Sequence, residues 1–208
     1  FSESPCLVLG LLLIGIIFKS NKAVLLTTSL TIIALIIFYR FPKRNVNQQS
    51  NNVIVSPCDG KVLSIKKVND KYTRIVIYLS IFNVHTQWYP CSGKIKKVVY
   101  KPGEFNLAHM LEKSEYNERV QTTIDAGLSN DIGIVQIAGQ VARRIVNKSK
   151  TDETVTKGSY MGMIKLSSRV DVYLPNEGLN VRVIEGQDVR GCETNIAEYI
   201  KPRMYYHN

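Results

Sequence analysis

The hydrophobic pattern of the chain changes near residue 40. Before that point, two runs at residues 5–18 (PCLVLGLLLIGIIF) and 23–39 (AVLLTTSLTIIALIIFY) contain no charged side chain and are separated by KSNK. Each run is slightly shorter than the roughly 20 apolar residues that a solitary membrane-spanning helix needs. We therefore predict a helical hairpin over residues 1–40, in or through a membrane, with basic residues at its ends. The alternative is a cleaved signal peptide, which the second apolar run and the lack of a small-residue cleavage site between the runs disfavour.

Beyond a polar, turn-prone linker at residues 41–52, the pattern becomes one of short β-branched runs between turn signals. Alternation with a period of two dominates, as in KVLSIKKV (61–68) and VDVYL (170–174), which is typical of strands with one buried face. A single stretch, residues 105–120, has the pattern of a helix. For residues 53–208 we predict a mostly β (α+β) domain, a sandwich or distorted barrel with minimal helix.

The net charge indicates the class of partner, and the cysteines and histidines indicate whether disulfides or metal sites are expected. The formal net charge is +10, and a basic domain held at a bilayer is attracted to anionic headgroups by about 1 kcal/mol for each nearby Lys or Arg. No nucleic-acid recognition motif accompanies this charge, so no nucleic-acid partner is predicted. The four cysteines are scattered without a CxxC pair and are expected to be small buried residues rather than disulfides or metal ligands. With three histidines in the chain, we predict no metal site.

Three short stretches contain candidate catalytic residues. In IKLSSRVDVYLP (164–175), two adjacent hydroxyls, Ser167 and Ser168, interrupt a strand pattern. In VSPCDGKV (55–62), Asp59 marks a tight turn, where it either caps the turn or faces a histidine. His85 follows an apolar strand and is either a satisfied core residue or a catalytic one. A serine hydrolase is disfavoured, because no G-x-S-x-G elbow surrounds Ser168.

These stretches and several others resemble phosphatidylserine decarboxylase. The similar segments occur in the family's order over residues 42–197 and are SPCDG (56–60), FNVH (82–85), PCSG (90–93), PGEF (102–105), NER (117–119), VQIAGQVARRIV (135–146), G-x-x-x-G-x-I-K-x-x-SRVDVYLP (158–175) and VIEGQDVRGCETNIA (183–197). The N-terminal hairpin resembles that of the shorter, membrane-associated form of the family.

The resemblance implies a proenzyme that cleaves itself. The Ser168 hydroxyl, deprotonated by a histidine that an aspartate orients, would attack the carbonyl of Ser167 and form an ester. β-Elimination would then release residues 1–167 as the β chain and leave dehydroalanine at 168. Hydrolysis with loss of ammonia would give an N-terminal pyruvoyl group on the α chain, residues 168–208. Because the cut strand is part of a sheet, the two chains are expected to remain together as a heterodimer.

The same resemblance implies the reaction, the partner and the location. The pyruvoyl ketone would form a Schiff base with the amine of phosphatidylserine, accept electrons as carbon dioxide leaves, and release phosphatidylethanolamine. No added cofactor is needed, and the substrate stays in the bilayer. The expected location is the cell (inner) membrane, with the catalytic domain on the cytoplasmic side.

Family roles map onto individual residues. Asp59 matches the family's triad aspartate and Ser168 its pyruvoyl precursor. His85 matches the first of two histidines in longer members and would serve both self-cleavage and turnover, because Trp88 occupies the second position. Trp88 and Tyr89 differ from the usual polar residues and could line the lipid site. Ser167 replaces a glycine, which tolerates strained backbone more readily than any residue with a Cβ.

Other readings remain open. The chain could be an unprocessed pseudoenzyme that binds anionic lipid, or a decarboxylase of an archaeal ether-lipid analogue (archaetidylserine). A biotinyl or lipoyl carrier domain is disfavoured, because neither Met-Lys-Met nor Asp-Lys-Ala occurs.

Overall fold

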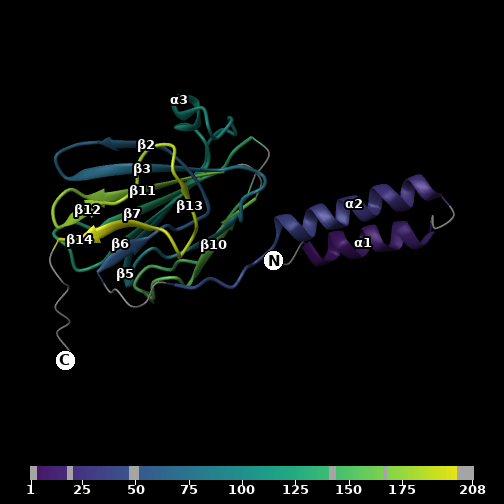
Figure 1. The fold of residues 1–208 in the computed structure, drawn as a ribbon, viewed down its shortest axis with the longest axis horizontal. Helices are drawn as coiled ribbons and strands as arrows, with labels where there is room; N and C mark the ends of the chain where they lie inside the picture. The colour runs from purple at the N-terminus through teal and green to yellow at the C-terminus, as the bar shows by residue number, and fades with distance from the viewer. Residues whose placement is uncertain (1–3, 18–20, 47–51, 141–143, 166–167, 201–208) are drawn as a thin grey trace. The chain divides into compact units, whose positions relative to one another are not determined.

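The computed structural model describes residues 4–17, 21–46, 52–140, 144–165 and 168–200 (Figure 1). The chain divides into two compact units, with the boundary after Phe41.

The first unit consists of two helices, α1 (Ser4–Ile17) and α2 (Lys22–Phe38), which contact each other. The helix α2 begins at a side-chain cap, because Asn21 Oδ1 accepts hydrogen bonds from the amides of Ala23 and Val24 at 3.1 and 3.3 Å. Two helices are therefore present where the apolar runs predict them. Within the described ranges, neither helix combines the length and apolar character required to cross a bilayer. The membrane part of the predicted hairpin is not confirmed and stays a prediction.

The second unit is mostly β, as the alternating pattern predicts. It contains one four-residue helix, α3 (Leu111–Ser114), among its described residues. Its strands are β1 (Val53–Val55), β2 (Gly60–Lys67), β3 (Tyr72–Leu79), β4 (Thr86–Trp88), β5 (Gly93–Lys101), β6 (Arg119–Asp125), β7 (Ile132–Ile137), β8 (Ile145–Asn147), β9 (Thr154–Val155), β10 (Tyr160–Ile164), β11 (Ser168–Pro175), β12 (Leu179–Val181), β13 (Asp188–Val189) and β14 (Asn195–Tyr199).

The strands form one large and two small sheets. The eight-stranded sheet has the order β13-β2-β3-β11-β7-β6-β5-β9, and the three-stranded sheets have the orders β1-β14-β12 and β4-β10-β8. All paired strands that the structure describes are antiparallel, and β2, β3, β11, β7 and β6 follow one another across the large sheet in Figure 1. Strand β11 therefore lies near the centre of the large sheet.

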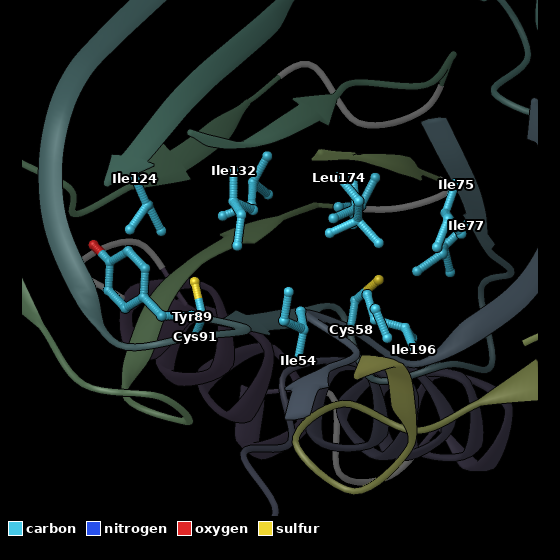
Figure 2. Packing of buried hydrophobic residues seen from close by; sticks show 14 of the residues in the cluster. Ile54, Cys58, Ile75, Ile77, Tyr89, Cys91, Ile124, Ile132, Leu174 and Ile196 are labelled. Atoms are coloured by element: carbon cyan, nitrogen blue, oxygen red, sulfur yellow. The ribbon is translucent and has the colours of Figure 1, made fainter. Parts of the chain in front are cut away.

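A large hydrophobic cluster lies between the large sheet and the small sheet β1-β14-β12. Figure 2 shows Ile132 and Leu174 of the large sheet facing Ile54 and Ile196 of the small sheet β1-β14-β12. These four side chains are fully buried. The layers pack like a sandwich, with the alternate residues of each strand pointing into the core.

The prediction of a helix over residues 105–120 is wrong for most of its length. Only α3 is helical, and β6 already begins at Arg119. Asn117 Oδ1 accepts from the amide of Asn106, and Asn117 Nδ2 donates to the carbonyls of Asn106 and Ala138, at 2.7–2.8 Å. These side-chain hydrogen bonds satisfy backbone groups that a helix would otherwise pair internally, so the segment forms a closed loop.

Candidate functional site

Ser168 is the first residue of β11 and lies opposite Leu79 of β3. Side chains alternate along a strand, so Ser168 shares its face with Val170 and Val172, and all three are fully buried. Its Oγ is shielded from solvent and has no hydrogen-bond partner among the residues that the structure describes. A buried hydroxyl without a hydrogen bond lowers the stability of the folded state by about 1–3 kcal/mol, which indicates a role other than packing. Ser167 lies outside the described residues.

His85 is also fully buried. It follows the turn at residues 80–83, and its Nδ1 lies 2.9 Å from the carbonyl oxygen of Asn83. The turn itself is fixed by Asn83, whose Oδ1 accepts hydrogen bonds from the amide and the hydroxyl of Ser80 at 2.9 and 2.7 Å. The ring of His85 is therefore held by its own loop.

The topology brings Ser168 and His85 to the same end of the large sheet. Leu79, the last residue of β3, pairs with Ser168, and the amide of Ile164, the last residue of β10, donates to the carbonyl of His85 at 3.3 Å. Strand pairing and a main-chain hydrogen bond therefore link the segments that contain two of the three predicted catalytic residues.

Asp59 has different neighbours. It ends the turn between β1 and β2, and its two carboxylate oxygens accept hydrogen bonds from Arg44 Nη2 at 2.8 and 2.7 Å. The amide of Gly191 donates to the same carboxylate at 2.8 Å. Arg44 also lies over the ring of Trp88, 5.4 Å from its centroid, and 3.7 Å from Glu193. The hydrogen bonds that the structure shows for Asp59 thus lead to Arg44 and Gly191, and its predicted role beside His85 stays a prediction.

The two aromatic residues predicted to line the lipid site lie in the interior. Trp88 and Tyr89 are each 3% exposed. The ring of Trp88 packs on Gly191, where an added Cβ would approach it to 2.5 Å. The hydroxyl of Tyr89 lies 2.8 Å from that of Ser149. Their role in substrate binding stays a prediction.

A buried ionic network that the sequence did not reveal follows Ser168 directly. Arg169 is fully buried, and its guanidinium donates two hydrogen bonds of 2.7 Å to the carboxylate of Asp171. It also donates to Glu115 at 2.7 Å, to the hydroxyl of Ser114 at 2.6 Å and to the carbonyl of Leu111 at 3.2 Å. The network joins the start of β11 to the loop that contains α3. Charged residues at alternate positions of an otherwise apolar strand are the only signal of it in the sequence.

The charges of this network stabilise one another. Burial would lower the pKa of Arg169, but the hydrogen bonds and charges of Asp171 and Glu115 raise it well above its usual range. Burial would likewise raise the pKa of Glu115, but hydrogen bonds and charges from Arg169 and Arg74 lower it. Both groups are therefore ionised at neutral pH.

A second unpredicted network consists of side-chain amides behind His85. Gln87 Nε2 donates to the carbonyl of His85, Gln136 Nε2 donates to Gln87 Oε1 at 2.9 Å, and Asn147 Nδ2 donates to Gln136 Oε1 at 2.7 Å. Gln87 and Gln136 are fully buried. The chain of amides fixes the main chain of His85 relative to β7 and β8. Gln136, a polar residue inside the apolar strand IGIVQI, was its signal in the sequence.

The described residues can be compared with the requirements of a metal site and of a pyruvoyl group. No group of three His, Cys, Asp or Glu side chains that could hold a metal ion occurs in the described part of the chain. Cys58, Cys91 and Cys192 are free and buried, as predicted for small core residues. A pyruvoyl group requires a serine at the start of a held segment, and the buried Oγ of Ser168 at the first position of β11 fits that requirement.

Comparisons with known proteins identify a family and several similar proteins. The sequence model of the family described as phosphatidylserine decarboxylase matches residues 33–197, a range that includes Asp59, His85 and Ser168. The curated proteins named phosphatidylserine decarboxylase proenzyme from Burkholderia mallei strains SAVP1, NCTC 10247 and ATCC 23344 are each 37% identical to this chain over 174 residues. The aligned region covers 81% of this chain and 80% of each relative.

Proposed function

This chain belongs to the phosphatidylserine decarboxylase family of carboxy-lyases, and from that premise we propose that it removes the carboxylate of phosphatidylserine with a pyruvoyl group made from its own Ser168. The products are carbon dioxide and phosphatidylethanolamine. The observation that supports the proposal most directly is the buried hydroxyl of Ser168, which has no hydrogen-bond partner among the described residues.

Self-cleavage comes first. His85 takes the proton of the Ser168 hydroxyl, and Oγ bonds to the carbonyl carbon of Ser167 while the peptide C–N bond breaks and the freed amine gains a proton. Loss of the Cα proton of Ser168 then breaks the new ester's bond between Cβ and Oγ. Residues 1–167 leave with a carboxylate at their end, and water replaces the nitrogen of residue 168, which departs as ammonia. The burial of Ser168 and His85, together with the linkage of their segments, supports this assignment.

In turnover, a pyruvoyl group at residue 168 would supply a carbonyl able to bond to the substrate amine and to accept the electrons left by the departing carbon dioxide. The protein's part is to exclude water and to deliver a proton to the carbon that lost its carboxylate. His85 is the proposed donor, because it is buried at the same end of the large sheet as Ser168. Asp59, Trp88 and Tyr89 are proposed to shape the site around these two residues.

The proposed partners are the membrane and the two chains of the cleaved protein. The apolar helices α1 and α2 and the net charge of +10 support binding to an anionic bilayer. The inner membrane, with the catalytic domain in the cytoplasm, is the proposed location. The ladder between Ser168–Pro175 and Tyr72–Leu79 supports a heterodimer of residues 1–167 and 168–208.

Mass spectrometry of the denatured protein tests the proposal. We expect two fragments that separate between residues 167 and 168, the smaller one beginning with a pyruvoyl group, and a single uncut chain from Ser168→Ala. Incubation with phosphatidylserine and borohydride should attach the lipid to the smaller fragment. A wild-type chain that stays uncut would support the pseudoenzyme reading, and an adduct formed with archaetidylserine alone would identify the ether lipid as substrate.

A further inference from the structure

We infer that Asn83 is the positioning residue of His85. The main-chain carbonyl of Asn83 contacts the His85 ring, and the side chain of Asn83 fixes that carbonyl by closing the turn with Ser80. The importance of this for catalysis rests on the proposed role of His85 as the base of self-cleavage. The family resemblance predicts that an aspartate, Asp59, orients the ring of His85.

The contact with Asn83 selects one form of the His85 ring. A carbonyl oxygen can only accept a hydrogen bond, and it lies 2.9 Å from Nδ1. In the neutral ring, the proton therefore sits on Nδ1, and the lone pair is on Nε2. A base must accept a proton at a nitrogen that carries a lone pair, so the contact with Asn83 leaves Nε2 as the basic nitrogen for the proposed reaction with the Ser168 hydroxyl.

The main chain is held on both sides of the His85 ring, at the turn that contains Asn83 and at the carbonyl of His85 itself. On one side, the side chain of Asn83 accepts two hydrogen bonds from Ser80, and the amide of Asn83 donates to the Ser80 carbonyl at 3.0 Å, which closes the turn. On the other side, Gln87 and Ile164 donate to the carbonyl of His85. The turn leads directly from Leu79, which pairs with Ser168. The ring is thus held relative to the strand that carries the nucleophile.

The hydrogen bonds described for Asp59 are with residues other than His85. Its carboxylate accepts two hydrogen bonds from Arg44 and one from the amide of Gly191. The contact that the structure describes at Nδ1 of His85 is with a main-chain carbonyl, in a turn closed by the asparagine side chain of the same loop.

Nuclear magnetic resonance of the ring nitrogens tests the inference directly. The uncut Ser168→Ala chain, labelled with ¹⁵N-histidine, should show Nδ1 protonated and Nε2 unprotonated at His85. The chain has three histidines, so His109→Gln and His207→Gln complete the assignment. Adding Asn83→Asp retains an acceptor oxygen in the side chain and should preserve this pattern. Asn83→Leu keeps the main-chain carbonyl but removes the side-chain acceptor that closes the turn with Ser80, so the carbonyl is no longer held and the ring should give a mixture of the two neutral forms.

Rates of self-cleavage provide the functional comparison. Asn83→Leu should slow cleavage by about 10-fold or more, because base catalysis depends on the correct form of the ring, whereas Asn83→Asp should stay within a few-fold of wild type. Ser80→Ala, which removes one of the two hydrogen bonds to the Asn83 side chain, should lie between them. Circular dichroism should show that each variant folds.

The inference is overturned if Asn83→Leu keeps both the ring pattern and the cleavage rate, or if Asp59→Asn alters the ring pattern and Asn83→Leu does not. The ring measurement is made on an uncut chain and needs no catalysis. A wild-type chain that fails to cleave, with Nδ1 protonated in the Asn83-dependent way, would therefore refute the proposed function and support the positioning role.

Discussion

The guanidinium of Arg169 and the carboxylate of Glu115 lie 2.7 Å apart, on opposite sides of the proposed cut. Arg169 belongs to the fragment that begins at residue 168, and Glu115 belongs to the fragment that ends at 167. A charged contact directly beside the new chain end ties that end to the larger fragment. It also couples the nucleophile's strand to the loop around α3.

Replacing Arg169 should be costly. Arg169→Met leaves the buried carboxylate of Asp171 without its main partner, and we expect the free energy of unfolding to fall by about 3–5 kcal/mol. Urea unfolding of the uncut Ser168→Ala chain measures the change. The matched control is Arg182→Met, because Arg182 forms an exposed ion pair with Glu198 and should contribute less than about 1 kcal/mol. Equal losses in the two variants would contradict the assigned role of the buried network.

The pH dependence of the free energy of unfolding should show the contribution of the Glu115 carboxylate. Its pKa is lowered in the folded protein, chiefly by Arg169 once the opposing effect of burial is overcome. A lowered folded pKa stabilises the fold at pH values above the unfolded value of about 4.3, and this contribution is lost as the pH falls through the folded pKa. The stability difference between the parent chain and Glu115→Gln should therefore be largest near neutral pH and shrink below about pH 4. Urea midpoints measured across this range test it, and a difference that does not change with pH would contradict it.

The buried thiols should be unreactive in the folded protein. Burial, with a contribution from the charge of Asp59, raises the pKa of Cys58 well above its usual value, and burial raises the pKa of Cys192 to about 12. Only the thiolate reacts readily, so a disulfide reagent at pH 8 should modify none of the three buried cysteines of a Cys6→Ala chain until it is denatured. Asp70→Cys, at a fully exposed position, provides the reactive control. Rapid labelling without denaturant would show that the core opens.

Gly191 should be intolerant of a side chain. An added Cβ would lie 2.5 Å from the ring of Trp88 and 3.3 Å from the carbonyl carbon of Cys58. We expect Gly191→Ala to lower the free energy of unfolding by about 1–3 kcal/mol. It should also shift the fluorescence of Trp88, the single tryptophan of the chain. Gly10→Ala, where a Cβ meets no atom within 4 Å, should change neither property.

Ser167 should limit the rate of maturation. The family resemblance places a glycine at this position, and a Cβ restricts the backbone conformations available to the attacked carbonyl. We expect Ser167→Gly to cleave several-fold faster than wild type, as followed by the appearance of the two fragments on a denaturing gel. Slower cleavage would mean that the Ser167 side chain assists the reaction.

Local patterns in the sequence predicted the strands better than the site. Period-two alternation is a property of neighbouring residues, so the faces of β11 followed from Val170, Val172 and Leu174 alone. The loop at residues 105–117 did not follow, because Asn117 bonds to Ala138, a contact between residues distant in sequence. The hydrogen-bond partners of Asp59 were not predicted either, because Arg44 and Gly191 belong to segments distant from it in sequence. Ser168 and His85 were predicted from the family resemblance, and the structure adds that both are buried and that their segments are linked through Leu79 and Ile164.

The central position of β11 also determines the order of events in the life of the protein. This strand is paired along both edges, with β3 over Ser168–Pro175 and with β7 over Arg169–Tyr173. The proposed cleavage forms a chain end inside a finished sheet, so folding must precede it. A cleaved molecule that unfolds would have to find its other fragment by diffusion before it could refold. Maturation therefore replaces a protein that can refold from one chain with one whose working lifetime depends on how slowly it unfolds.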